Sequence, residues 1–307
     1  MESYVAGLDG GGTKTAVSIC DLSGAEQERF SVGPVNYNGT DARLVEESMA
    51  KIFARLAQSR GLKNCRALCL GAAGISNPAV RGKLEPLIRR CGYKNELILT
   101  GDQQTALYGA MGEPCGVILI AGTGSICYGR NREGKECRTG GCGYRIDDGG
   151  SGYAIGREIL SAAVRAMDGR ARPTVLTALL AGRWTLTTRD EIVRFVYDPK
   201  TGKKEIASLA GLLAEAWEQK DAAAIAIARR CVSELYGMAS PVVRDLELQN
   251  GRFSWAGGIL SNQAFLRDRL LERLRRNFPE LKCAAPKNDA AFGAAGMALS
   301  AALEHLH

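Results

Sequence analysis

Short apolar runs that predict β-strands recur along the chain and alternate with stretches of helical periodicity. The predicted strands cover residues 4–8, 15–20, 66–70, 96–100, 117–121 and 253–256. Apolar side chains repeat at helical spacing from Leu44 to Leu56 and from Ile155 to Val164. Residues 173–248 are almost entirely helical in pattern, with a predicted bend at Pro241. This alternation predicts an α/β protein with mixed sheets.

One strand–turn–strand pattern occurs twice. Residues 5–19 and residues 117–129 each contain an apolar run, a glycine-rich turn closed by a hydroxyl residue, and a second run. The repeat predicts a duplication that produces two related domains with a cleft between them, where small ligands commonly bind.

The composition is that of an ordinary globular protein. A length of 307 residues fits two domains better than one. The formal net charge of +7 suits anionic ligands, but it is too small and dispersed for nucleic-acid binding. The sequence lacks the run of about 18 apolar residues that a membrane span requires. Because residues 1–12 lack the basic start and apolar core of a signal peptide, we expect a cytoplasmic protein.

The ten cysteines are expected to be reduced thiols, as is usual in the cytoplasm. The closest pairs do not have the C-x-x-C spacing of a zinc site, and both histidines, His305 and His307, lie in the last three residues. A thiol-bound metal at Cys137 and Cys142 stays open as an alternative.

Two glycine-rich turns are candidates for phosphate binding. In residues 9–15, glycine permits close approach of backbone N–H groups to phosphate oxygens, and the neighbouring side chains add hydroxyl and ammonium donors. Asp9 ends the first strand, where a carboxylate can hold Mg²⁺ through water. The alternative for one such turn is a plain β-hairpin. A second turn at residues 121–125 favours phosphate binding, since two turns can grip a polyphosphate from both sides.

Asp102 directly follows a predicted strand and precedes a helix. Phosphoryl transfer to an alcohol needs a base that orients the hydroxyl group and accepts its proton, and Asp commonly has this role. The alternative is a helix N-cap, which Asp also fills well. The two phosphate loops favour the base.

Two further glycine-containing segments complete the pattern. Residues 140–160 begin with glycines and acids, of which Asp147 and Asp148 can accept hydrogen bonds from sugar hydroxyls, and continue as a helix. A merely flexible loop is the alternative, but the aromatic Tyr144 and Tyr153 argue against it. Residues 253–262 are predicted to form a strand, a Gly–Gly pair and a helix, an arrangement suited to lie against an adenosine. The alternative is a simple strand–helix turn without a ligand.

The order of these motifs resembles that of the BadF/BadG/BcrA/BcrD ATPase family, and within it of the N-acetylglucosamine kinases, over essentially the whole chain. The resemblance implies the acetate and sugar kinase/heat-shock chaperone/actin superfamily, with an RNase-H-like fold in both domains. It implies an N-terminal domain of residues 1–114, to which a C-terminal helix of residues 288–307 returns. Residues 115–287 then form a second domain with a helical insertion.

Carried over residue by residue, the resemblance implies contacts with ATP, Mg²⁺ and an amino sugar. Asp102 is similar to the family's catalytic base, and Asp9 would hold Mg²⁺ through water. The implied ATP contacts are Gly11, Gly12, Thr13, Lys14, Thr123, Gly124, Gly257 and Gly258. The implied sugar contacts are Asn36, Asp102, Ser125, Gly143, Tyr144 and Asp148.

Two departures from the family pattern concern the sugar. Ile126 follows Ser125 where animal N-acetylglucosamine kinases have asparagine, so one sugar hydrogen bond is missing or replaced. Residues 147–151 lack the glutamate of the family run G-D-E-G-S. Both changes leave the identity of the sugar open.

The hypothesis is therefore a Mg·ATP-dependent kinase for the 6-hydroxyl of N-acetylglucosamine, with glucosamine and N-acetylmuramic acid as close alternatives. The rival is an ATPase activator of a 2-hydroxyacyl-CoA dehydratase or benzoyl-CoA reductase system, which would hold an iron–sulfur cluster through cysteines. A repressor would need a DNA-binding segment, and an actin-like filament protein is compatible with the fold alone. A homodimer stays open.

Overall fold

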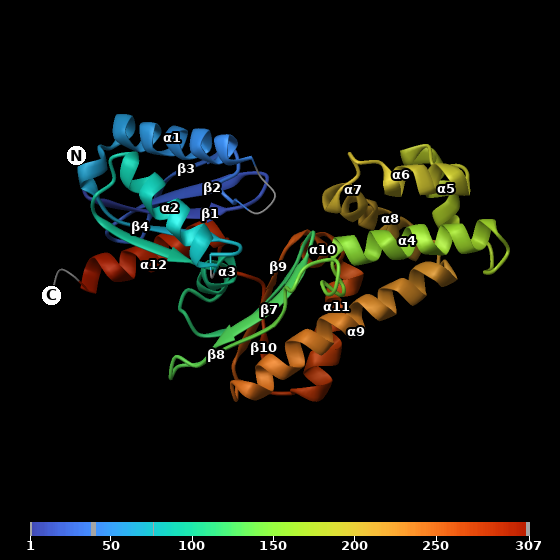
Figure 1. The fold of residues 1–307 in the computed structure, drawn as a ribbon. Helices are drawn as coiled ribbons and strands as arrows, with labels where there is room; N and C mark the ends of the chain where they lie inside the picture. Colours follow the sequence, from blue (N-terminus) through green and yellow to red (C-terminus); the bar gives the residue numbers. More distant parts are fainter. Residues whose placement is uncertain (1, 38–40, 76, 305–307) are drawn as a thin grey trace. The chain divides into compact units, whose positions relative to one another are not determined.

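The chain forms two compact units in a computed structural model that describes residues 2–37, 41–75 and 77–304 (Figure 1). Unit 1 consists of Met1–Gly116 and Ala285–His307, and unit 2 of Val117–Ala284. Each unit combines a five-stranded mixed sheet with helices, which confirms the predicted α/β class. Of the predicted C-terminal helix, residues 305–307, with both histidines, lie outside the described residues.

The sheet of unit 1 has the strand order β3-β2-β1-β4-β5. Its strands are β1 Tyr4–Gly10, β2 Thr15–Asp21, β3 Glu26–Val32, β4 Cys65–Ala72 and β5 Glu96–Thr100. Strands β1, β2 and β3 pair antiparallel, whereas β1, β4 and β5 pair in parallel. Four of these strands are predicted correctly. The sequence misses β3, an edge strand with one buried side chain, Phe30.

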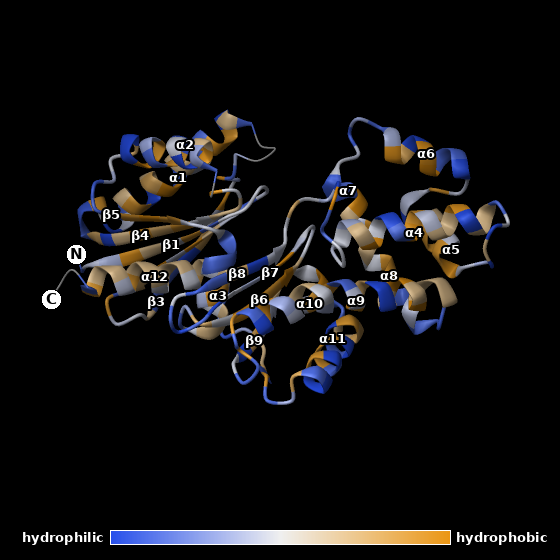
Figure 2. Ribbon diagram, turned by 60° about the horizontal axis from the view of Figure 1, so that its bottom comes forward, coloured by the Kyte–Doolittle hydropathy of each residue, from blue (hydrophilic) through white to orange (hydrophobic). Residues whose placement is uncertain are grey.

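Helices cover both faces of this sheet. They are α1 Ala42–Ser59, α2 Pro78–Arg90, α3 Asp102–Met111 and α12 Ala290–Glu304, with a 3₁₀ turn at Leu62–Asn64. The buried side chains of α1 and α2 pack on one face of the hydrophobic strands, and α12 packs on the other (Figure 2). Gly7 of β1 allows this close approach, because a Cβ atom there would collide with the backbone of α12. Gly293 and Gly296 likewise let α12 lie close against α3.

The sheet of unit 2 has the order β10-β9-β6-β7-β8. Its strands are β6 Gly116–Ala121, β7 Ser125–Arg130, β8 Glu136–Gly140, β9 Arg252–Ala256 and β10 Lys282–Cys283. The first three strands of each unit neighbour one another in chain order, and the fourth lies beside the first. The two sheets therefore have the same strand order, as expected for the predicted duplication.

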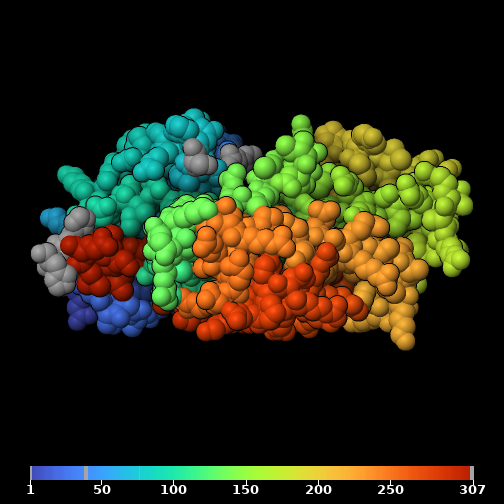
Figure 3. Space-filling view, turned by 90° about the horizontal axis from the view of Figure 1, so that it is seen from below, coloured from blue at the N-terminus to red at the C-terminus, as the bar shows by residue number. Residues whose placement is uncertain are grey.

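Helices make up most of the rest of unit 2. They are α4 Gly152–Met167, α5 Val175–Trp184, α6 Arg189–Tyr197, α7 Lys203–Ser208, α8 Leu212–Glu218, α9 Ala222–Asp245, α10 Gly258–Asn262 and α11 Ala264–Asn277, with a 3₁₀ turn at Leu209–Gly211. Helix α9 continues through Pro241 and lies beside α11 on one face of the unit (Figure 3). In the described part of the chain, no helix combines the length and apolar character needed to cross a bilayer.

Candidate functional site

Strand register brings two carboxylates to one edge of the sheet in unit 1. Asp9 of β1 pairs with Gly71 of β4, and Gly71 pairs with Thr100, the last residue of β5. Because these strands are parallel, their carboxyl ends meet at the same edge. Asp102 follows β5 after one residue, so its side chain lies at the same edge as that of Asp9.

The environment of this edge disfavours negative charge. Burial, followed by the carboxylates of Asp102 and Asp289, raises the pKa of Asp9 to about 6, whereas Lys14 acts to lower it. Burial also raises the pKa of Asp102. A raised pKa makes a carboxylate a better proton acceptor, and such shifts are typical of functional sites.

The alternative role of Asp102 as a helix N-cap is wrong. The N-cap position of α3 is Gly101, and Asp102 is the first residue of the helix. The side-chain oxygen of Gln104 accepts a hydrogen bond from the Gly101 N–H at 2.8 Å, so the capping interaction comes from glutamine. The Asp102 carboxylate accepts the adjacent Gln103 N–H at 3.0 Å. A carboxylate has about four acceptor positions, so these backbone contacts leave the partly buried Asp102 side chain able to accept a further hydrogen bond.

The first glycine-rich turn exposes its tip. The Gly11 N–H donates to the Lys14 carbonyl at 3.1 Å and closes the turn. Gly12, Thr13 and Lys14 are exposed. Asn36, the predicted sugar contact in unit 1, is buried.

The second glycine-rich turn is held by the start of α4. The Gly122 N–H donates to the Gly124 carbonyl at 2.9 Å. The Gly152 and Tyr153 N–H groups donate to the carbonyls of Gly122 and Thr123, at 2.8 and 3.3 Å. The turn's carbonyls are thus occupied. Among the described residues, the N–H groups of Thr123 and Gly124 donate no hydrogen bond. Such N–H groups suit an anion.

At Gly257, the segment between β9 and α10 lies close against the backbone of this turn. Gly257 has φ +88°, and a Cβ atom there would lie 2.8 Å from the Gly122 nitrogen and collide with the Ala121 carbonyl. Only glycine permits this approach without strain. The register explains it, since β6 and β9 are parallel and Ile120 pairs with Ala256.

A pocket of about 520 Å³ opens beside these turns in unit 2. This volume is in the range of small-molecule sites. Thr123 and Gly258, both predicted ATP contacts, line it. Its other lining residues are Gly122, Gly152, Lys204, Ala207, Ser208, Ala210, Gly211, Ala214, Ile259, Asn262 and Gln263. The sequence does not predict that α7 and α8 line this pocket. Their segments, KKEIAS and LLAEAWE, have the pattern of ordinary surface helices and contain no glycine-rich turn that would indicate a binding site.

The loop that follows β8 is a defined turn. The Asp147 N–H donates to the Gly143 carbonyl at 2.8 Å, and Asp147 accepts the Cys142 N–H at 3.0 Å. The rings of Tyr144 and Tyr153 meet edge to face, with centroids 4.7 Å apart. The alternative interpretation of this segment as a merely flexible loop is therefore wrong.

Two predicted sugar contacts of unit 2 already have protein partners. Ser125 is buried, and its hydroxyl donates to the Gly149 carbonyl at 2.8 Å. Asp148 is 2% exposed and accepts from the ammonium group of Lys203 at 2.8 Å. Ile126 packs against the backbone of Gly141, where a Cβ atom would lie 2.9 Å from its terminal methyl group.

The donor set at the edge of unit 1 fits magnesium. Mg²⁺ is usually bound by one or two carboxylates and several waters, and the carboxylate of Asp9 supplies such a ligand. No group of three or more Cys, His, Asp or Glu side chains suited to a metal exists among the described residues. All ten cysteines lie in that part of the chain and are free thiols.

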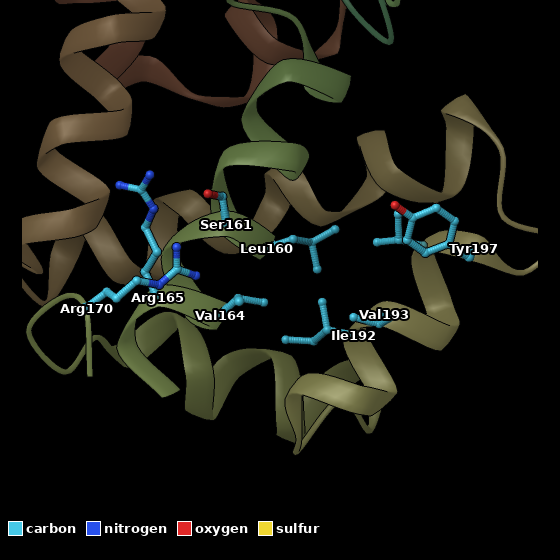
Figure 4. Close-up of a pocket in the computed structure, with 9 residues that line it drawn as sticks. Leu160, Ser161, Val164, Arg165, Arg170, Ile192, Val193 and Tyr197 are labelled. Atoms are coloured by element: carbon cyan, nitrogen blue, oxygen red, sulfur yellow. The ribbon is translucent and has the colours of Figure 1, made fainter. Parts of the chain in front are cut away.

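Figure 4 shows a further pocket of unit 2, of about 320 Å³, between α4 and α6. Apolar side chains such as Leu160 and Ile192 line most of it, with Arg165 and Arg170 at one end. None of the predicted site residues lines this pocket, so it is separate from the phosphate turns.

Comparison with known proteins gives consistent matches over nearly the whole chain. The model of the BadF/BadG/BcrA/BcrD ATPase family matches residues 6–299. An N-acetylmuramic acid/N-acetylglucosamine kinase from Clostridium acetobutylicum is 36% identical over 303 residues, which cover 97% of this chain and 98% of the relative. An N-acetyl-D-glucosamine kinase from Dictyostelium discoideum is 28% identical over 309 residues, covering 96% and 97%. A crystal structure from Chromobacterium violaceum, whose description proposes an N-acetylglucosamine kinase, has a TM-score of 0.79 at 25% identity and covers 97% and 99%.

Proposed function

The chain belongs to the BadF/BadG/BcrA/BcrD ATPase family, and on this basis we propose that it is an ATP-dependent amino-sugar kinase. The observation that carries the proposal is the pair of carboxylates, Asp9 and Asp102, at one sheet edge beside a glycine-rich turn. The names of the two curated relatives support an amino sugar as the phosphate acceptor.

The pocket of unit 2 is our candidate for the nucleoside part of ATP. Its size suits a nucleoside, and Gly258 and Ile259 offer an apolar surface. The exposed turn at Gly12 and the free N–H groups of Thr123 and Gly124 are candidates for the phosphates.

Asp102 is our candidate for the general base. It would accept the proton of the attacking sugar hydroxyl as the new O–P bond forms and the bond to the departing ADP breaks. Asp9 would hold Mg²⁺ through water, and the ion, when bound, would neutralise charge on the phosphate oxygens. The raised pKa of Asp102 supports its role as a proton acceptor.

The preferred acceptor in this proposal is the 6-hydroxyl of N-acetylglucosamine. Ile126 presents an apolar side chain where animal relatives offer an asparagine, and an apolar wall discriminates weakly between ligands. We therefore propose broad use of amino sugars, including glucosamine and N-acetylmuramic acid. A cytoplasmic location and a homodimer stay predictions.

An assay of ADP release tests the function. The purified chain is given Mg·ATP and, one at a time, N-acetylglucosamine, N-acetylmuramic acid, glucosamine, N-acetylmannosamine and glucose. We expect amino sugars to stimulate ADP release at least tenfold over the rate without sugar. ADP release that no sugar stimulates would contradict the proposal.

The ATPase-activator alternative predicts a different result in the same preparation. Protein purified without oxygen would then contain iron and sulfide and would be coloured. We expect no iron above background. Iron in stoichiometric amounts, together with sugar-independent ADP release, would favour the alternative.

A further inference from the structure

Lys203 lies at the second glycine-rich turn, although its position in the sequence gives no sign of this. It begins α7 and is 79 positions beyond Gly124 (203 − 124) in the chain. A Cβ atom on Gly124 would lie 2.9 Å from the Lys203 ammonium nitrogen and equally close to an Asp148 oxygen. The ion pair therefore contacts the turn itself, and Gly124 leaves just enough room for it.

The position of Lys203 is fixed by groups around it. Its ammonium group donates to Asp148 at 2.8 Å and lies 5.5 Å from the centre of the Tyr144 ring. The backbone of α7 lies close against α4, because Gly156 has no side chain to hold Ile206 away. A charged lysine is thus held in place before any ligand arrives.

Asp148 depends on this partner. Its side chain is only 3% exposed, and a buried carboxylate without a cation is strongly unfavourable. It also has φ +62°, an uncommon conformation for a residue other than glycine. The ion pair with Asp148 therefore holds the Lys203 ammonium group at the turn.

Lys203 keeps capacity for a second partner. Its side chain is 31% exposed, and an ammonium group has three N–H donors, one of which Asp148 uses. The N–H groups of Thr123 and Gly124 lie in the same turn and donate no hydrogen bond within the described residues. A fixed cation beside unused N–H groups matches an anionic oxygen ligand.

We propose that Lys203 binds a phosphate group of the nucleotide at the second glycine-rich turn, and that Asp148 positions its ammonium group. The inference deepens the proposed function and rests on its assignment of ATP. It assigns phosphate rather than a sugar carboxylate because the ammonium nitrogen contacts the turn that offers the free N–H groups.

The test compares ADP with adenosine, which lacks phosphates. Binding of Mg·ADP is measured by calorimetry and binding of adenosine by ligand-observed NMR, for the wild type and Lys203→Met. We expect Lys203→Met to weaken ADP binding by about 10- to 100-fold, the range of a hydrogen bond to a charged group. Adenosine affinity should stay within about twofold, and ADP binding should become less sensitive to salt.

Two further variants separate binding from folding and from net charge. Lys203→Met alone leaves Asp148 buried and unpaired, so it should lower Tm. Asp148→Asn combined with Lys203→Met removes both charges and should recover most of the Tm while ADP binding stays weak. Lys200→Met changes the net charge equally at an exposed position of the same segment, and ADP binding should stay at the wild-type value.

Each other result has a defined meaning. Equal ADP affinity in the wild type and the double variant would overturn the inference while leaving the kinase proposal intact. Equal losses for ADP and adenosine would overturn it in favour of a purely structural ion pair. If Lys203→Met leaves ADP binding unchanged and raises only the KM for N-acetylmuramic acid in the ADP-release assay, Lys203 binds the carboxylate of that sugar instead. A wild type that binds no ADP would overturn the proposed function itself.

Discussion

Burial and the neighbouring carboxylate of Asp102 together raise the pKa of Asp9 to about 6. The two side chains come from separate elements, β1 and the start of α3, and lie at the same edge of the sheet because β1, β4 and β5 end there. Stability alone would not place two acids there, since each charge makes the other less favourable. This relationship gives a test that does not depend on activity.

Replacing Asp9 by asparagine should stabilise the protein at neutral pH in the absence of magnesium. The pKa is about 6 in the folded state and 3.8 in the reference state, so the folded state binds more protons between these values. The free energy of unfolding therefore falls as pH rises from about 4 to 6, and above pH 6 it keeps the full decrease that ionised Asp9 causes. Asp9→Asn should gain about 1–3 kcal/mol at pH 7.5 and almost nothing at pH 4. Urea unfolding at the two pH values measures this difference.

Asp21, in β2 of the same sheet, is the control with the opposite sign. Its exposed carboxylate accepts hydrogen bonds from Ser23 and Ala25, which lower its pKa. Asp21→Asn should therefore leave stability unchanged or reduce it at pH 7.5. A gain at Asp21, or none at Asp9, would contradict the electrostatic account.

Replacing Asp102 by asparagine should stop proton transfer without disturbing the fold. Turnover should fall by roughly 10²–10⁴, the usual contribution of a positioned general base, while ADP binding stays within about twofold. The matched control is Asp41→Asn, which changes a carboxylate that caps α1 by accepting the Arg43 N–H. Asparagine caps a helix as well as aspartate does, so this variant should keep full activity. Near wild-type turnover of Asp102→Asn would reject Asp102 as the base.

Replacing Gly257 by alanine should weaken nucleotide binding. The new Cβ atom would meet the Ala121 carbonyl in a backbone conformation that L-residues rarely adopt, a strain of about 1–3 kcal/mol. Relief of the clash would displace the second turn. Gly237→Ala is the control, because Gly237 lies within α9 with open space around it and should gain about 0.5–1 kcal/mol. Calorimetry with ADP and thermal unfolding of both variants check these opposite effects.

Replacing Ile126 by asparagine should shift sugar preference. The ratio of kcat/KM values for N-acetylglucosamine and glucosamine should move toward N-acetylglucosamine by about 1–2 kcal/mol if one net hydrogen bond is restored. Ile126→Val keeps the apolar contact with Gly141 and should preserve the wild-type ratio. If the asparagine variant has the same preference profile as the wild type, Ile126 does not contact the sugar.

The sequence predicts most strands well because their buried faces are continuously apolar, as in β1 and β4. It misses β3, where a mainly polar edge strand has only Phe30 to indicate burial. It also misses β8 and the two-residue strand β10 of unit 2. It also leaves open whether Asp102 caps α3, because the choice depends on where the helix begins, and the glutamine side chain of Gln104 decides it. The contact of Lys203 with Asp148 joins segments far apart in the chain, and no local pattern encodes such a pair.

The product formed from N-acetylglucosamine labelled with ¹³C at C6 tests the central claim most directly. After incubation with the chain and Mg·ATP, the account predicts a C6 signal split by coupling to phosphorus, in an amount equal to the ADP released. In the Asp102→Asn variant the same signal should appear at least about 100 times more slowly. An unsplit C6 signal while ATP is consumed would contradict phosphorylation of the 6-hydroxyl, and the absence of any phosphorylated sugar would contradict the kinase assignment.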